Sequence, residues 1–145
     1  MRGFVFIELL VVLAIISILA SVAIPAYTDY LVRAHVAEGI VLAIPVQKAV
    51  RDYYAYHGRF PADNREANVL KPEQLKGAYV SSITVLNGNI QITFDALNTV
   101  EKENILSFQP QIIAENPLGM VSWQCGQDEK TTLESKYLPS SCRNR

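Results

Sequence analysis

Two groups of residues in this chain could do chemistry: an acid inside an apolar run, and two cysteines near the C-terminus. Glu8 is the single charged residue between Phe4 and Ile24. A carboxylate in hydrocarbon is costly enough that it marks a functional position in need of a partner group. The nearest candidate in sequence is the α-amine that would exist if the chain were cut after Gly3. Glu8 therefore predicts a contact with a processed N-terminus.

Cys125 and Cys142 both lie in the last 21 residues of the chain. An even number of cysteines beside an export-type N-terminus predicts a disulfide formed in an oxidising compartment. Two free buried thiols are the alternative. In the chain-entropy model, a disulfide between them would stabilise the fold by roughly 3 kcal/mol, because it restricts the unfolded chain.

Other chemistry is missing from the sequence. His35 and His57 have no Cys or carboxylate at a familiar ligand spacing, so each is expected on a helix surface and no metal site is predicted. The chain contains no Gly-rich phosphate loop, nucleophile elbow or spaced acid pair. These observations predict a protein that is not an enzyme and that takes no cofactor.

The length of the chain fits one ordinary domain, and its small net charge does not indicate a strongly charged partner. The chain has 145 residues and a formal net charge of −1, too small to indicate nucleic acid or an anionic membrane surface as the main partner. Six basic residues could still form a patch for DNA or host glycans, although solvated surface is the favoured interpretation: Lys71, Lys76, Lys130, Lys136, Arg143 and Arg145.

The apolar run is expected to form an α-helix. At about 1.5 Å per residue, a helix over Phe4–Ile24 spans about 30 Å, the thickness of a bilayer core. A cleaved secretory signal is the alternative, but its apolar stretch is normally shorter and helical patterning here continues onward. Because Arg2 and the amino terminus precede the run, the N-terminus should face the cytoplasm and everything after Pro25 should be exported.

Beyond Pro25 the helix turns amphipathic. A core-facing stripe is predicted at i, i+3, i+4 spacing over Leu42, Val46, Ala49, Val50 and Tyr53. Pro25 and Pro45 each remove one backbone hydrogen bond, so each should bend or loosen the helix. The helix should end near His57-Gly58.

The remaining residues predict a small sheet. Val80–Leu86 and Ile90–Phe94 are β-rich runs separated by the hairpin signal Asn87-Gly88-Asn89. Third and fourth strands are expected at Ile105–Phe108 and Val121–Trp123, and Pro110 indicates that the third ends there or lies at an edge. Before the sheet, residues 58–77 should form a long loop with one short helical turn.

These features together resemble type IV pilins. The resemblance rests on Gly3-Phe4 and Glu8 followed by LLVVLAIISILASVAIPAY, on the loop GRFPADNREA, and on a tail with Trp123-Gln124-Cys125, Lys136-Tyr137-Leu138-Pro139 and Cys142-Arg143. It covers nearly the whole chain. The tail resembles that of type IVa pilins and is generally missing from type II secretion pseudopilins.

The resemblance implies specific roles for residues at the N-terminus. A prepilin peptidase would cut after Gly3 and methylate Phe4, although the leader Met1–Gly3 is shorter than is usual in the family. Glu8 would pair with the terminal amine of a neighbouring subunit. Pro25 and Pro45 match prolines that bend the long helix of type IVa pilins.

The expected fold is α+β: a long N-terminal α-helix with a protruding apolar half, packed on a small four-stranded antiparallel sheet with a C-terminal disulfide-bounded loop. The expected parts are a leader (1–3), a membrane and filament-core helix (4–24), its amphipathic continuation (25–57) and a globular head (58–145).

The expected function is that of a structural subunit that polymerises into a type IVa pilus, with adhesion, twitching motility and DNA uptake implied by the resemblance alone. Expected partners are further copies of the chain, the inner membrane before assembly, the prepilin peptidase and the assembly machinery, with DNA or a host receptor by resemblance. The chain would pass from an inner-membrane pool to an extracellular pilus. The alternatives are a minor pilin, a pseudopilin, and a membrane-anchored monomeric binding domain.

Overall fold

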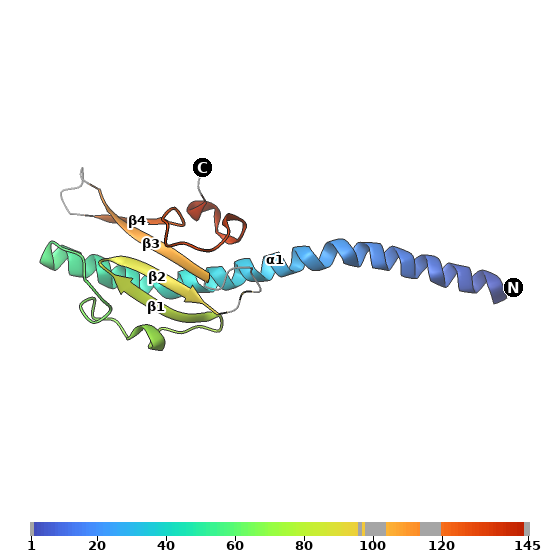
Figure 1. The fold of residues 1–145 in the computed structure, drawn as a ribbon, viewed down its shortest axis with the longest axis horizontal. Coiled ribbons are helices and arrows are strands. Elements are labelled where there is room, and N and C mark those ends of the chain that lie inside the picture. Colours follow the sequence, from blue (N-terminus) through green and yellow to red (C-terminus); the bar gives the residue numbers. More distant parts are fainter. Residues whose placement is uncertain (1, 96, 98–103, 114–119, 144–145) are drawn as a thin grey trace. The chain divides into compact units, whose positions relative to one another are not determined.

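A computed structural model describes residues 2–95, 97, 104–113 and 120–143 (Figure 1). The chain separates into two compact units, Met1–Leu31 and Val32–Arg145. The second unit carries the sheet and the tail, and it matches the α+β fold expected from the sequence.

One helix, α1 (Arg2–His57), supplies all of the described first unit and the first element of the second. The helix is continuous through Pro25 and Pro45, so the bends expected at these residues stay predictions. It ends where the sequence indicated, because Gly58 takes the left-handed conformation (φ +65°) that suits a residue without Cβ, and its N–H donates to the Tyr54 carbonyl.

The buried face of α1 differs in detail from the expected stripe. Its buried positions recur at spacings of four and three and begin at Val32: Val32, Val36, Gly39, Ala43, Val46 and Val50. Leu42, Ala49 and Tyr53 are only half-buried. The prediction therefore identified the correct face but placed its centre to one side, and it missed Val32, Val36 and Ala43.

Four antiparallel strands form one sheet in the order β1-β2-β3-β4. They are β1 (Val80–Leu86), β2 (Asn89–Phe94), β3 (Asn104–Ile112) and β4 (Val121–Cys125). Three short 3-10 turns complete the described elements: η1 (Pro72–Gln74), η2 (Ser135–Tyr137) and η3 (Ser140–Cys142). The single short turn expected within the loop at 58–77 corresponds to η1.

The β1–β2 hairpin forms at the predicted signal Asn87-Gly88-Asn89, but its turn has two residues because Asn89 already belongs to β2. Leu86 pairs with Asn89, and Asn87 and Gly88 have φ values of +51° and +82°. Positive φ at both positions is the geometry that Asn-Gly favours in tight hairpins. A bulge at Ser81 shifts the register between Val80 and Ser82.

The third strand is longer than the sequence indicated, because Pro110 lies inside the strand and does not end it. In an antiparallel strand, one residue's N–H and C=O point to the same side, and successive residues alternate. The Ile113 N–H donates to the Met120 carbonyl, so odd positions of β3 face β4 and even positions face β2. The β2 ladder ends at Phe108, so Pro110 lies on an open edge where no N–H is needed. Proline is thus tolerated inside β3.

The core of the second unit lies between α1 and the sheet. Buried residues from the helix share one cluster with Ile83, Val85, Ile90, Ile92, Leu106 and Phe108. The tail adds Leu133, Tyr137 and Leu138 to the same cluster. Burial of this apolar area, at about 25 cal/mol per Å², is the main stabilising contribution to the head.

Candidate assembly site

The N-terminal part of α1 carries a long run of exposed apolar side chains. From Phe4 to Ile24, all its large aliphatic and aromatic residues are exposed in the single chain. By length and composition α1 is a candidate membrane span, with a mean hydropathy of 2.8 in its most apolar window and no part of that window buried. An uncovered surface of this length needs lipid or other protein to cover it.

Three residues are predicted to take part in processing and assembly, and all lie in the first unit: Gly3, Phe4 and Glu8. Gly3 has open space around it, Phe4 is 77% exposed, and Glu8 lies one turn further along, also exposed. Phe4 and Glu8 are four residues apart, so they share one face of the helix. The described structure thus places Phe4 and Glu8 about one helical turn apart along the axis.

The two cysteines form the expected disulfide, Cys125–Cys142, with 17 residues of sequence separation. Both are buried, at 8% and 2% exposed. Gly126 follows with a φ of +73°, and a side chain there would collide with the Cys142 carbonyl. The bond closes the loop that carries η2 and η3, so the alternative of two free thiols is wrong.

A buried polar cluster provides a second attachment for the disulfide-bounded loop, and the sequence interpretation missed it. The Ser107 hydroxyl on β3 lies 2.7 Å from both the Asn89 amide oxygen and the Asp128 carboxylate. The Thr131 hydroxyl donates to Asp128 (2.9 Å) and accepts the Ser107 N–H (3.2 Å). Asp128 and Thr131 are three residues apart in a polar stretch, which is the only sequence signal that a local side-chain turn forms there.

The same segment covers the part of β3 that β4 does not reach. The Ile105 N–H donates to the Thr132 hydroxyl (2.9 Å), and the Thr132 N–H donates back to the Ile105 carbonyl (3.0 Å). β4 pairs only from Phe108 onward, so these bonds satisfy an otherwise open stretch of backbone.

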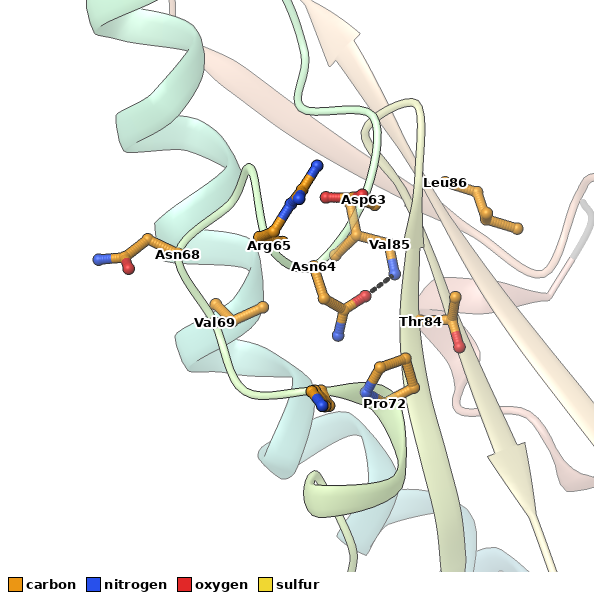
Figure 2. Close-up of a pocket in the computed structure, with 10 residues that line it drawn as sticks. Asp63, Asn64, Arg65, Asn68, Val69, Pro72, Thr84, Val85 and Leu86 are labelled. Carbon is orange, nitrogen blue, oxygen red and sulfur yellow. Dashed lines mark hydrogen bonds between the residues drawn. The ribbon is translucent and has the colours of Figure 1, made fainter.

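On the opposite edge, the loop at 58–77 is fastened to β1 by one buried amide. The Asn64 oxygen accepts the Val85 N–H (2.7 Å), and its NH₂ donates to the carbonyls of Ile83 (2.9 Å) and Leu70 (3.0 Å). Figure 2 shows Asn64 between the loop and β1, with Asn68 turned away. Loop and strand border a cavity of about 410 Å³, with Val69, Pro72 and Leu86 among its walls.

An ion pair within this loop holds together its first residues, next to the end of α1. Arg59 makes a two-pronged ion pair with Glu66, at 2.9 and 3.2 Å, and Glu66 also accepts the Ala62 N–H at 2.8 Å. The Arg59 hydrogen bond, followed by the Ala62 N–H, lowers the pKa of Glu66 to about 2. The carboxylate raises the pKa of Arg59 in turn. The guanidinium also lies 5.3 Å from the Tyr53 ring centroid.

The remaining candidate residues show no shared site. Within the described ranges, no group of three or more His, Cys, Asp or Glu could hold a metal ion. His35 stacks on Tyr79 and His57 stacks on Tyr53. The five described residues of the basic set are all exposed, as both a binding patch and solvated surface require: Lys71, Lys76, Lys130, Lys136 and Arg143. Arg145 lies outside the described residues.

Comparison with known proteins identifies the family. A family model described as pilin, a bacterial filament protein, matches residues 32–143. The type IV major pilin protein PilE of Neisseria gonorrhoeae is 40% identical over 159 residues, which cover 99% of this chain and 94% of PilE. This chain belongs to the pilin family.

Two further relatives agree with this assignment. The fimbrial protein of Neisseria meningitidis serogroup A is 38% identical over 162 residues, covering 99% of this chain and 94% of the relative. The fimbrial protein EcpC of Eikenella corrodens is 37% identical over 147 residues, covering 99% and 91%. The chain is a type IV pilin and a structural subunit of a pilus filament.

Proposed function

We propose that this pilin is the major subunit of a type IVa pilus and that Glu8 directs its assembly. The observation that carries the proposal is the exposed apolar surface from Phe4 to Ile24, interrupted by one carboxylate. Helices of neighbouring subunits would cover this surface in the filament core, and lipid would cover it beforehand. Apolar burial would hold the polymer once a subunit leaves the bilayer.

The proposed partner of Glu8 is the terminal amine of Phe4 on the neighbouring subunit. A peptidase would cut after Gly3 and methylate Phe4, leaving a cation four residues before the acid. Each charge alone is poorly solvated between apolar helices, whereas together they are nearly neutral. Pairing across subunits would also fix the axial position of one helix against the next.

The proposed life of the chain runs from an inner-membrane pool to an extracellular filament. The four parts (1–3, 4–24, 25–57 and 58–145) would serve as leader, core helix, connecting helix and exposed head. Assembly would depend on a prepilin peptidase and on motor proteins elsewhere. Adhesion, twitching motility and DNA uptake are proposed for the whole pilus rather than for a site on this subunit, and no catalysis is proposed for the chain.

Sheared surface fibres provide the test of this function. We expect this chain to be their main component, to begin at methylated Phe4 by mass analysis, and to contain Cys125 linked to Cys142. Glu8→Gln keeps the size but loses the charge, and it should abolish fibres while the protein stays in the membrane. Normal fibres from this variant would refute the role of Glu8. A trace amount of the chain in wild-type fibres would indicate a minor pilin instead.

A further inference from the structure

Two arginines from opposite ends of the sequence line one small cavity of the second unit. Arg33 lies on α1 near the start of this unit, and Arg143 follows the disulfide-bonded Cys142. The cavity is about 140 Å³, and its other walls come from the same two segments: Ala37, Ile40, Tyr137, Leu138 and Pro139. Of the described residues that line it, none is acidic. The cavity is therefore positively charged and suited to an anion.

Both guanidinium groups have donors left for such an anion. The Arg143 Nε–H donates to the Leu138 carbonyl (2.8 Å), which holds the group against the tail and leaves its Nη groups without a partner among the described residues. No ion pair between described residues includes Arg33 or Arg143. A guanidinium presents its N–H donors in a planar fork that fits the oxygens of a carboxylate or a phosphate.

We propose that Arg33 and Arg143 bind a phosphate group, and that the headgroup of a membrane lipid supplies it before the subunit is assembled. A cavity of about 150 Å³ is enough to hold benzene. The cavity between the two arginines, at about 140 Å³, therefore has room for a phosphate group and little more. The lipid source rests on the membrane stage of the proposed function.

The position of Arg33 along α1 favours a lipid as the source. Arg33 follows Ile24, the last residue of the apolar run, by nine residues of continuous helix, or about 13 Å. The polar layer of a bilayer is about 5–8 Å thick on each side of the hydrocarbon core. Helical side chains tilt toward the N-terminus, and a long arginine side chain near a membrane span extends to the interface. When Phe4–Ile24 spans the bilayer, the Arg33 guanidinium can therefore reach the lipid phosphates.

Occupancy of the site should stabilise the tail locally. The Leu138 N–H donates to the Ser135 carbonyl and the Cys142 N–H to the Pro139 carbonyl, so both amides report on opening of the tail. An anion held by both arginines would link the tail to α1, and a ligand that binds only the closed form makes opening less frequent. Slower hydrogen exchange at these two amides is therefore the expected sign of binding.

Vesicles with and without lipid phosphate test the site. In phosphatidylglycerol vesicles, the Leu138 and Cys142 amides of the full-length wild-type chain should exchange about tenfold more slowly than in vesicles of digalactosyl diacylglycerol, which contains no phosphate. In Arg33→Gln this difference should disappear. Lys71→Gln, which removes one positive charge at another exposed position, should keep it. Equal wild-type rates in the two vesicles, or an equal loss in the two variants, would overturn the proposal.

Inorganic phosphate separates the two sources of the anion. Added to the digalactosyl diacylglycerol vesicles, it should slow the same amides only well above about 1 mM, because it lacks the chains that hold a headgroup beside the site. Half-maximal protection below about 1 mM would assign the site to free phosphate and refute the lipid source. The measurement uses membrane-anchored subunits and does not depend on fibre formation. Normal fibres without this protection would contradict the site alone, whereas missing wild-type fibres would contradict the proposed function.

Discussion

Gly39 of α1 lies directly against the Phe94 ring of β2. A Cβ placed on Gly39 would lie 2.5 Å from the Phe94 ring and 3.1 Å from a methyl group of Ile92. Gly39 is buried, and its lack of a side chain lets the helix backbone lie directly on the aromatic ring. The helix–sheet distance, and with it the burial of Val36 and Ala43 on either side, depends on this contact.

Substitution of Gly39 should therefore destabilise the head although glycine is a poor helix former. Removing glycine from a helix interior gains up to about 1 kcal/mol. Overpacking a core costs about 1–3 kcal/mol. For Gly39→Val we expect a net loss of about 1–2 kcal/mol in the free energy of unfolding, measured by urea denaturation. Ala37→Val, at an exposed position of the same helix, is the control and should change stability by less than about 1 kcal/mol. Equal losses for both variants would contradict the packing role.

Loss of the Asn64 side chain should detach the loop from β1. In Asn64→Ala the Val85 N–H and the Ile83 carbonyl lose their partners in a buried position. Each unsatisfied buried group costs about 1–3 kcal/mol, so we expect a loss of about 2–4 kcal/mol and faster hydrogen exchange at the Val85 amide. Asn68→Gly, at a φ of +54° that glycine also favours, is the control and should leave this amide protected. An unchanged exchange rate in Asn64→Ala would show that the loop is held elsewhere.

The sequence predicted the elements that carry strong local signals and missed the contacts made across the fold. The Asn87-Gly88 turn, the end of α1 at Gly58 and the cysteine pair are specified by residues that few other conformations suit, and all three were confirmed. Asn64 and Asp128 look like ordinary loop residues in the sequence. Their partners lie on strands 18 or more residues away, so only the folded topology reveals their roles.

The Arg59–Glu66 pair predicts a stability change in acid. The pKa of Glu66 is lowered from 4.5 to about 2 in the fold, so its contribution is fully present above about pH 4.5 and is lost as the pH falls toward about 2. The stability of Glu66→Gln, measured by thermal unfolding, should not show this pH-dependent loss between pH 4.5 and 2. The stability difference between wild type and variant should therefore disappear at the acid end. The pair is partly exposed, so added salt should weaken the effect. A constant difference at all pH values would refute the assignment.

Removal of the disulfide should cost about 3 kcal/mol, the entropy expected for a closed loop of this length. Cys125→Ala with Cys142→Ala removes both sulfur atoms without leaving a free thiol. We expect a lower urea midpoint and loss of fibres at elevated temperature, with the sheet still formed by circular dichroism. Comparison with the wild-type protein under non-reducing conditions provides the reference. Full stability in the double variant would show that the packing of Tyr137 and Leu138, together with the Asp128 cluster, fixes the tail without the disulfide.

The Asp128 cluster should hold the other end of the same loop independently of the disulfide. In Asp128→Ala the hydroxyls of Ser107 and Thr131 lose their shared acceptor, so the amides of Ile105 and Ser107 should exchange faster. Glu129→Ala changes an exposed acid beside it and serves as the control. When Asp128→Ala is combined with the two cysteine substitutions, the loss in unfolding free energy should equal the sum of the separate losses to within about 0.5 kcal/mol if the two attachments are independent. A combined loss well beyond the sum would mean that each attachment holds the loop when the other is gone, and that the tail is a single cooperative unit.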